Sequence, residues 1–421
     1  MIAKRSWLRI WRILGPGLIT GAADDDPSGI ATYSQAGAQF GYGLTWTMFL
    51  TLPFMAAIQI ISACIGWGTQ AGLTRNIAQQ FSKPVVYSLV GLLIMANTIN
   101  IAADLAAMGD SLRLVVGGPA IFYAVAFGAA CLVAEIFVPY HRYAGYLKFL
   151  TLVLFVYVAA AFSTQVPWGQ VALATIFPSI SFDRDLLLTV VAVFGTTISP
   201  YLFFWQASQE AEESWLSYRR THQAKVGLSR AAFGHVSLDT WTGMTISNVI
   251  AFFIIVTTAA TLHAHGVTEV NTAAQAAEAL RPIAGQLTFA LFAAGIIGTG
   301  LLAVPVLAGS AAYAAAEAFG LRGSLELPAS RALGFYGIIG SATTAGALLA
   351  ATKVDPIAML FWTAVINGIV AVPIMIAMML VVSGRRGQSI VALPGWLRIL
   401  GWLGCLLMGL TVVMLGWTSA F

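Results

Sequence analysis

Long apolar runs separated by short polar segments dominate the chain. A helix needs about 20 apolar residues to cross the hydrocarbon core of a bilayer. We expect eleven such helices, at about 10–33, 43–66, 84–108, 118–138, 144–164, 186–208, 241–262, 284–308, 332–352, 357–383 and 394–418. The segment at about 209–240 is polar and basic, and we expect a solvated connector there. The pattern predicts an all-α integral membrane protein.

Lysine and arginine are distributed unevenly between the two sets of loops. If the N-terminus is cytoplasmic, 17 of the 21 lie on the cytoplasmic side, and the four exceptions are Arg113, Arg184, Arg281 and Lys353. Cytoplasmic loops of membrane proteins carry such an excess. The bias therefore predicts a cytoplasmic N-terminus, an odd number of spans and an external C-terminus, in the cell (inner) membrane.

The composition narrows the class of protein further. Only 9% of the residues are charged and the mean hydropathy is +0.84, whereas soluble domains carry about 25% charged residues. A net charge of +4 arises from the loops and does not indicate nucleic acid binding. Cys64, Cys131 and Cys405 are far apart, which is typical of packing residues rather than of a disulfide or metal motif. The spans contain no nucleophile–base–acid set, so we expect neither an enzyme nor a cofactor.

The first span contains a costly polar interruption. Asp24, Asp25 and Asp26 precede Pro27, and Gly29 follows two residues later. Proline cannot continue a helix cleanly, glycine permits other backbone angles, and an unwound stretch would free carbonyl oxygens. A carboxylate beside freed carbonyls is suited to a hard cation. The alternative is a kinked helix whose acidic residues cap its second half.

The sixth span contains a similar interruption at Gly195-Thr196-Thr197-Ile198-Ser199-Pro200. Its hydroxyl groups could instead satisfy the carbonyls of a simple proline kink. The two interruptions lie five spans apart, so the two halves would have opposite orientation. Paired interrupted helices of this kind mark the binding site of inverted-repeat transporters. We therefore expect one transporter domain over 1–421, with repeats at about 10–164 and 186–383 and an extra helix at about 394–418.

Polar residues also occur inside two other spans. Asn97, Asn100 and Asp104 share one face of the third predicted helix, which indicates either a hydrophilic path or hydrogen bonding between helices. In the tenth span, Asn367 precedes Gly368 and could offer an oxygen ligand near mid-depth. Every histidine lies in a loop or at a span end, so no imidazole is expected in mid-membrane.

The interrupted spans resemble those of the NRAMP (natural resistance-associated macrophage protein) family of divalent-metal transporters. Gly15-Pro16-Gly17 and Asp26-Pro27-Ser28-Gly29 look like the family's GPG and DPGN motifs, and Gly195–Tyr201 occupies the place of its motif ending in Met-Pro-His. Ala103-Asp104-Leu105-Ala106 looks like its acidic third-span motif. The resemblance implies a leucine-transporter-type fold of about eleven helices, with helices 1 and 6 interrupted.

Several positions depart from the family pattern. The metal-binding aspartate matches Asp26, but Gly29 stands for the family's asparagine, Ser199 for its methionine and Tyr201 for its histidine, and Ala107 replaces a glutamate. These departures resemble the NRAMP-related magnesium transporter branch. Oxygen ligands favour Mg²⁺ and Mn²⁺ over softer metals. Smaller residues at positions 29 and 199 would enlarge the pocket for a partly hydrated ion.

The resemblance implies a metal site and a surrounding set of residues. The metal site comprises Asp26, Gly29, Thr196, Ser199 and Asn367; the entrance or supporting residues are Asp24, Asp25, Thr197, Tyr201 and Asp104. We expect a monomeric importer of Mg²⁺, and also Mn²⁺, that works by alternating access in the lipid bilayer without proton coupling. The alternatives are a proton-coupled Mn²⁺/Fe²⁺ transporter, an organic-solute transporter of the same fold and a non-transporting sensor.

Overall fold

The computed structural model describes residues 15–138, 151–178, 183–221, 228–352, 354–384 and 391–420. Over these residues all regular secondary structure is helical. Nine helices are long and apolar enough to cross a membrane, or ten if one strongly bent pair is counted as a span. The expectation of an all-α membrane protein is confirmed.

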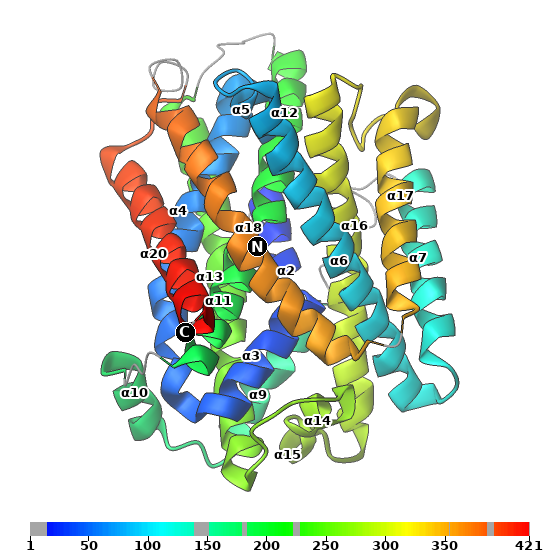
Figure 1. Ribbon diagram of the computed structural model, residues 1–421, viewed down its shortest axis with the longest axis vertical. Coiled ribbons are helices and arrows are strands. Elements are labelled where there is room, and N and C mark those ends of the chain that lie inside the picture. Colours follow the sequence, from blue (N-terminus) through cyan, green and yellow to red (C-terminus); the bar gives the residue numbers. More distant parts are fainter. Residues whose placement is uncertain are drawn as a thin grey trace, which may run out of the picture.

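Each of the eleven predicted spans coincides with a helix or a pair of helices, as far as it is described (Figure 1). The starts of the first and fifth predicted spans, at 10–14 and 144–150, lie outside the described residues. The helices are α2 (Pro16–Asp24) with α3 (Pro27–Phe40), α4 (Trp46–Thr69), α6 (Lys83–Val116), α7 (Ala120–Phe137), α9 (Phe155–Ser163), α11 (Arg184–Thr197) with α12 (Pro200–Thr221), α13 (Arg230–Thr261), α16 (Thr288–Phe319), α17 (Leu333–Ala350), α18 (Pro356–Ser383) and α20 (Gly395–Ala420).

The first and sixth spans are interrupted where the sequence predicts. The first divides into α2 and α3, which are too short to pass individually as spans, and the sixth divides into α11 and α12. Both second halves begin at a proline, which suits the first turn of a helix because its missing N–H would have no helical partner. The division into two repeats stays a prediction.

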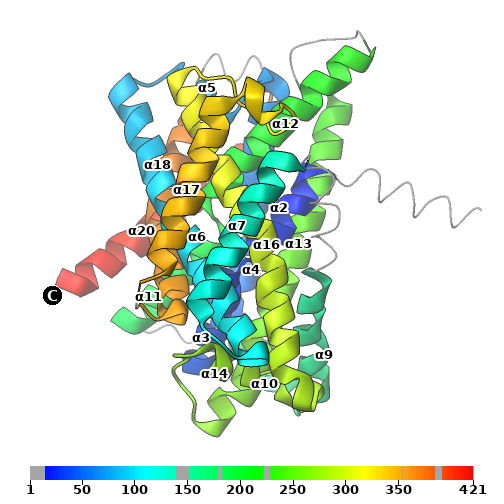
Figure 2. The same cartoon turned by 90° about the vertical axis from the view of Figure 1, so that its right-hand side faces the viewer.

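Small residues let the helices around these interruptions approach closely. A side chain at Gly66 of α4 would overlap the backbone of Ala207 in α12. A side chain at Gly195 of α11 would overlap the backbone of α18 at Ala364. Close backbone contact through small residues is a main source of helix association in lipid, where apolar burial adds little. The α7–α17 pair and α20 lie at opposite edges of the bundle (Figures 1 and 2).

Where it is described, the predicted connector at 209–240 is largely helical, and it is buried at its two ends. The α12 helix continues to Thr221 and α13 already begins at Arg230; residues 222–227 between them are outside the described part. Glu210 is only 2% exposed. Glu210 therefore faces other helices, which a hydropathy threshold cannot detect. Three further short helices, α5 (Leu73–Ile77), α10 (Trp168–Ile176) and α14 (Ala273–Glu278), occupy segments between the predicted spans.

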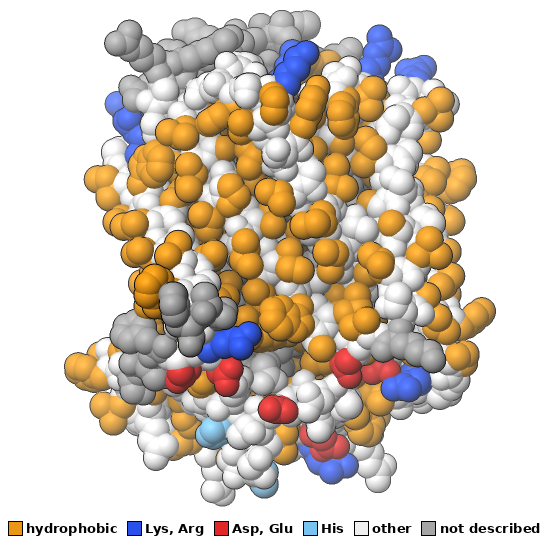
Figure 3. Space-filling model, viewed as in Figure 1, with side chains coloured by type: hydrophobic (Ala, Val, Ile, Leu, Met, Phe, Trp, Pro, Cys, Tyr) orange, Lys and Arg blue, Asp and Glu red, His pale blue; other side chains and the backbone are white. Residues whose placement is uncertain are grey.

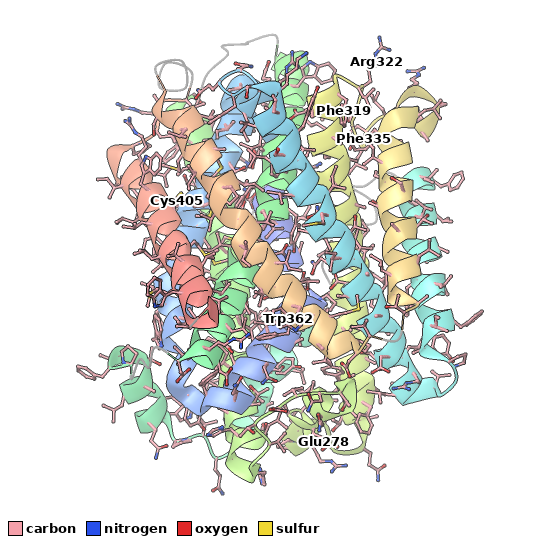
Figure 4. The ribbon with its side chains drawn as sticks, viewed as in Figure 1. Glu278, Phe319, Arg322, Phe335, Trp362 and Cys405 are labelled. Atoms are coloured by element: carbon pink, nitrogen blue, oxygen red, sulfur yellow. The ribbon has the colours of Figure 1, made fainter. Side chains whose placement is uncertain are left out.

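The surface shows a wide apolar belt between two polar ends (Figure 3). One end, which we call the basic end, carries a concentration of lysine and arginine. Arg322 lies at this end and Glu278 at the opposite end (Figure 4). An apolar belt flanked by polar ends is the arrangement expected of a chain that crosses a bilayer.

Candidate functional site

The first interruption leaves two residues outside helical geometry. Asp25 ends α2 with φ −84° and ψ 47°, and Asp26 is extended with φ −68° and ψ 171°. The Oδ1 atom of Asp26 accepts a hydrogen bond from the N–H of Gly29 at 2.7 Å and thereby caps α3. Asp26 therefore has the capping role that the sequence left open, and its remaining lone pairs are available for a cation.

The second interruption is stabilised by its own hydroxyl groups. Ser199 Oγ lies 2.8 Å from the carbonyl oxygen of Gly195 and 2.9 Å from that of Thr196, and its single hydrogen is directed at this pair of acceptors. Thr197 Oγ1 donates to the carbonyl of Val193 at 2.5 Å. The hydroxyls thus satisfy carbonyls at the end of α11, as the kink alternative predicts. The lone pairs of Ser199 Oγ can still face a cation because the hydroxyl hydrogen is directed into the helix.

The two interruptions lie against each other. The hydroxyl of Tyr201, in the first turn of α12, donates to the carbonyl oxygen of Ala23 at the end of α2, across 2.9 Å. A Cβ atom built at Gly29 would lie 3.2 Å from Oγ1 of Thr196 and 3.4 Å from Cε2 of Tyr33. The structure therefore brings together Asp26, Gly29, Thr196 and Tyr201, which the sequence predicted to share a site. Two carbonyl-bearing helix ends converge there, and such ends attract cations.

Gly29 has close neighbours, and the expected enlargement of the pocket stays a prediction. The atoms nearest to a Cβ at this position, at 3.2–3.4 Å, belong to Thr196, Asp24 and Tyr33. These neighbours would have to shift by a few tenths of an ångström to admit a Cβ atom at position 29. Tyr33 is fully buried and was not identified from the sequence, because a tyrosine within an apolar run looks like an ordinary core residue.

Asn367 lies beside the contact between α11 and α18. The neighbouring Gly368 packs against Gly195 so closely that a side chain on Gly195 would overlap the Gly368 backbone. Asn367 is 1% exposed, and its Oδ1 atom has no hydrogen-bond partner within the described residues. A buried amide oxygen without a partner is a candidate ligand for a cation. Its place beside the end of α11 agrees with the predicted role without testing it.

Asp24 and Asp25 are buried, at 1% and 2% exposure, rather than lining an open entrance. Ser247 of α13 lies 2.7 Å from Oδ2 of Asp24 and 3.0 Å from Oδ1 of Asp25. One hydroxyl carries one hydrogen and cannot donate to both carboxylates at once. Ser247 was missed because a lone serine in an apolar span gives no signal of its partners. In this closed arrangement the two aspartates support the end of α2.

The start of α2 is held by a residue from the same neighbouring helix. The N–H groups of Gly15 and Gly17 donate to Oδ1 and Oδ2 of Asp239 at 3.0 and 2.7 Å. Asp239 therefore caps α2 from α13, since Gly15 has no side chain to serve as a cap. The sequence analysis did not single out Asp239, because only tertiary structure brings it to α2.

The polar face of α6 points into the same region. Asn100 Nδ2 donates to Oδ2 of Asp26 across 3.0 Å. Asp104 lies one helical turn further on, is completely buried, and has no hydrogen-bond partner for either carboxylate oxygen within the described part of the chain. Asn97 instead donates to Leu307 and Ser310 of α16. The sequence left two interpretations of this helix face open, and both apply. Asn97 makes hydrogen bonds between helices, whereas Asn100 and Asp104 give a polar environment around Asp26.

The site is separated from a cavity at the basic end. This cavity of about 640 Å³ lies between the α4–α5 junction, α12 and α16, and its lining includes Ser208, Glu212 and Tyr313. Trp205 is fully buried, and its ring packs on that of Tyr313 with the centroids 6.2 Å apart. Along α12, Trp205 lies between Tyr201 of the site and Ser208 of the cavity lining.

Several known proteins resemble this chain in sequence or in fold. A divalent metal cation transporter of Verminephrobacter eiseniae is 28% identical over 296 residues, which is 68% of this chain and 64% of that protein. A manganese transporter of Eremococcus coleocola superposes with a TM-score of 0.72 at 18% identity, over 96% of this chain and 86% of the other. Mhp1, a nucleobase-cation-symport-1 family transporter, superposes with a TM-score of 0.58 at 13% identity, over 97% and 92%.

These structures confirm the leucine-transporter-type fold. The model of the natural resistance-associated macrophage protein-like family matches residues 17–418. Members of this family are transporters and not enzymes, in agreement with the expectation from the sequence. The chain therefore belongs to the natural resistance-associated macrophage protein-like family.

Proposed function

We propose that the protein imports divalent metal cations by alternating access, with Mg²⁺ as its main substrate and Mn²⁺ as a second. The observation that supports this most directly is Asp26, a buried carboxylate between two interrupted helices. No ion pair within the described residues neutralises Asp24, Asp25, Asp26 or Asp104. An uncompensated buried carboxylate is costly, and a divalent cation would relieve that cost.

The ligand set favours a hard ion. Within the described residues no three His, Cys, Asp or Glu side chains form a metal-binding group. An ion at Asp26 would therefore take most of its ligands from carbonyl, hydroxyl and amide oxygens and from water. Mg²⁺ commonly binds in this way, through one or two carboxylates while it keeps several waters. Thr196, Ser199 and Asn367 are the proposed additional ligands, together with the backbone at Gly29.

We propose that the membrane potential drives uptake without coupled protons. Two charges that cross 100 mV gain about 4.6 kcal/mol. This free energy corresponds to roughly 10³-fold accumulation, because each 1.4 kcal/mol is a factor of ten. Coupling to protons is therefore unnecessary. Tyr201 and Ala107, which replace a histidine and a glutamate of the family pattern, leave fewer groups that could carry protons.

The deciding measurement is flux in proteoliposomes at a clamped potential. We expect Mn²⁺ uptake that rises with an inside-negative potential and falls when millimolar Mg²⁺ competes. We expect no acidification of the lumen during uptake, with liposomes lacking protein as the control. Mn²⁺ flux that ignores millimolar Mg²⁺ would exclude a magnesium transporter.

Two alternative functions are each favoured by a separate observation. The relatives named as divalent metal cation transporters and the buried Asp104 favour a proton-coupled Mn²⁺ or Fe²⁺ carrier. Lumenal acidification that accompanies Mn²⁺ entry would support it. The Mhp1 structure contains a bound hydantoin, which favours an organic solute. Folded protein that binds no divalent cation by calorimetry would support that alternative.

We propose that the basic end faces the cytoplasm and that the N-terminus lies on that side. Arg322 and Glu278 mark the two ends (Figure 4). Cysteines placed at these two positions should react differently with an impermeant maleimide added to intact cells. We expect labelling of Glu278→Cys and protection of Arg322→Cys until the cells are broken. Cys64, Cys131 and Cys405 are buried and give the background. The reverse pattern would invert the topology.

A further inference from the structure

Asn100 lies between two acidic side chains of the binding region. Its Nδ2 atom donates to Asp26, whereas Asp104 lies one turn away on the same helix. Asn100 is completely buried, and its Oδ1 atom has no hydrogen-bond partner within the described residues. The same is true of both carboxylate oxygens of Asp104. Unpartnered buried oxygens beside a proposed cation site call for an explanation, and a bound ion is one.

We propose that Asn100 is a metal ligand whose amide turns over when the cation binds, so that Oδ1 replaces Nδ2 beside Asp26 and coordinates the ion. The inference rests on the proposed function, since it adds one ligand to the cation held by Asp26. It adds α6 to the site, besides the two interrupted helices and α18 with Asn367.

The Asn100 amide needs one orientation when the site is empty and the other when a cation is bound. An ionised carboxylate can only accept, so without a cation Asn100 must direct its NH₂ group at Asp26. A cation repels the NH₂ group and binds the amide oxygen, as asparagine carbonyls do in Ca²⁺ sites. The terminal torsion of asparagine is broad and roughly two-fold. The amide can therefore exchange its two ends without any movement of the backbone.

Asp104 provides the acceptor for the second orientation. Residues four apart on a helix are neighbours, with about 5–6 Å between their Cβ atoms. When Oδ1 turns toward the cation, Nδ2 turns toward the side of the helix that Asp104 occupies. The amide then exchanges its hydrogen bond to Asp26 for one to Asp104. Each orientation satisfies the NH₂ group, and the ion decides between them.

The first interrupted helix lacks an amide ligand that Asn100 could replace. Position 29 is glycine, and its N–H occupies Oδ1 of Asp26. Thr196 and Tyr33 lie close to it, and glycine offers no side-chain amide to the ion. Asn100 approaches Asp26 from the opposite carboxylate oxygen, Oδ2. An amide oxygen from α6 thus adds a neutral, hard ligand that suits Mg²⁺ and Mn²⁺.

The test compares three variants of the full-length protein in detergent. Calorimetry with Mn²⁺ and with Mg²⁺ should show affinity weakened at least about tenfold in Asn100→Ala. Asn100→Asp should bind at least as well as the wild type, because a carboxylate oxygen takes the place of the amide oxygen. Asn97→Ala is the matched control, since Asn97 is also buried on α6 but donates to α16. Its affinity should not change.

A side chain that merely positions Asp26 gives a different pattern. Asn100→Asp would then lose its donor and repel Asp26, so weaker binding than in Asn100→Ala would overturn the proposal. Unchanged affinity in Asn100→Ala would also overturn it. Should Asn100→Asp not fold, the protein can be labelled with ¹⁵N-asparagine and loaded with Mn²⁺. Pulsed electron paramagnetic resonance then measures the coupling between the ion and the amide nitrogen. The nitrogen coupling should weaken in Asn100→Ala and persist in Asn97→Ala; equal coupling in both would overturn the assignment.

Asp26→Ala separates this inference from the proposed function. If Asp26→Ala stops binding divalent cations while Asn100→Ala binds them normally, the cation site stands and the role of Asn100 falls. If Asp26→Ala binds cations as the wild type does, the cation site itself falls.

Discussion

Replacing Asp26 by alanine is expected to lower divalent-cation uptake by at least about 100-fold. Two unit charges 4 Å apart interact by about 4 kcal/mol at an effective dielectric constant of 20, and a divalent ion doubles this. Each 1.4 kcal/mol is about a factor of ten in affinity. Loss of even half of the attraction would therefore empty the site at ordinary concentrations. The measurement is initial Mn²⁺ uptake into proteoliposomes at a fixed potential.

Asparagine at the same position separates the two roles of Asp26. Asparagine is as good an N-cap as aspartate, so Asp26→Asn should preserve the start of α3 and the thermal stability. It lacks the charge, so transport should still be lost. Asp185→Ala removes an exposed aspartate from the first turn of α11 and should transport normally. Wild-type uptake by a folded Asp26→Asn variant would refute the proposed cation site.

The sequence was sufficient to locate the interrupted helices and the carboxylate between them. Pro27 and Pro200 each begin the second half of a broken span, and proline has a strong local effect on helix geometry. Charged residues within apolar runs are rare enough to be informative individually. Asp26 could be found for this reason, whereas Thr196 was located by the break before Pro200 and Tyr201 by the family resemblance; the structure places all three at the two facing interruptions.

The partners of these residues could not be predicted, because they come from other helices. Ser247 and Asp239 lie more than 200 positions from the residues that they hold. Asn100 was recognised as part of a polar helix face, but nothing in the sequence indicated that it reaches Asp26. The close neighbours of Gly29 could not be foreseen for the same reason, since Thr196 approaches from α11 and Tyr33 from the next turn of α3. Sequence periodicity shows which residues share one side of a helix, but it does not show which residues of other helices they contact.

The contacts of α2 with α13 indicate how the first interrupted helix is held in place. Asp239 caps the start of α2, and the Ser247 hydroxyl lies within hydrogen-bonding distance of Asp24 and Asp25 at its end. Between them, Gly21 of α2 packs directly on the backbone of Gly243 in α13. Polar contacts at both ends and a small-residue contact in the middle make α2 and α13 one unit. Movement of α2 alone would break all three contacts, so we infer that the two helices move together.

The glycine contact in the middle is the most sensitive point of this unit. Leucine at position 21 would overlap the backbone carbonyl of Gly243. Shifting the backbone of a packed helix costs more free energy than rotating a side chain. Overpacking costs about 1–3 kcal/mol where side chains can adjust, and we expect at least the upper end here. We predict that Gly21→Leu lowers the melting temperature and removes most of the Mn²⁺ uptake, since α2 is displaced from both Asp239 and Ser247.

The control for this substitution lies on a helix exposed at the surface of the bundle. Gly337 of α17 has nothing within 4 Å of an added Cβ, so Gly337→Leu should retain both stability and flux. A comparison of the two variants separates the effect of displacing α2 from the general effect of a larger apolar side chain in a membrane helix. Gly21→Leu protein that melts and transports like the wild type would show that α2 is not fixed to α13 during transport. If stability falls but flux survives, the contact matters for folding alone, and α2 can deliver the cation without α13.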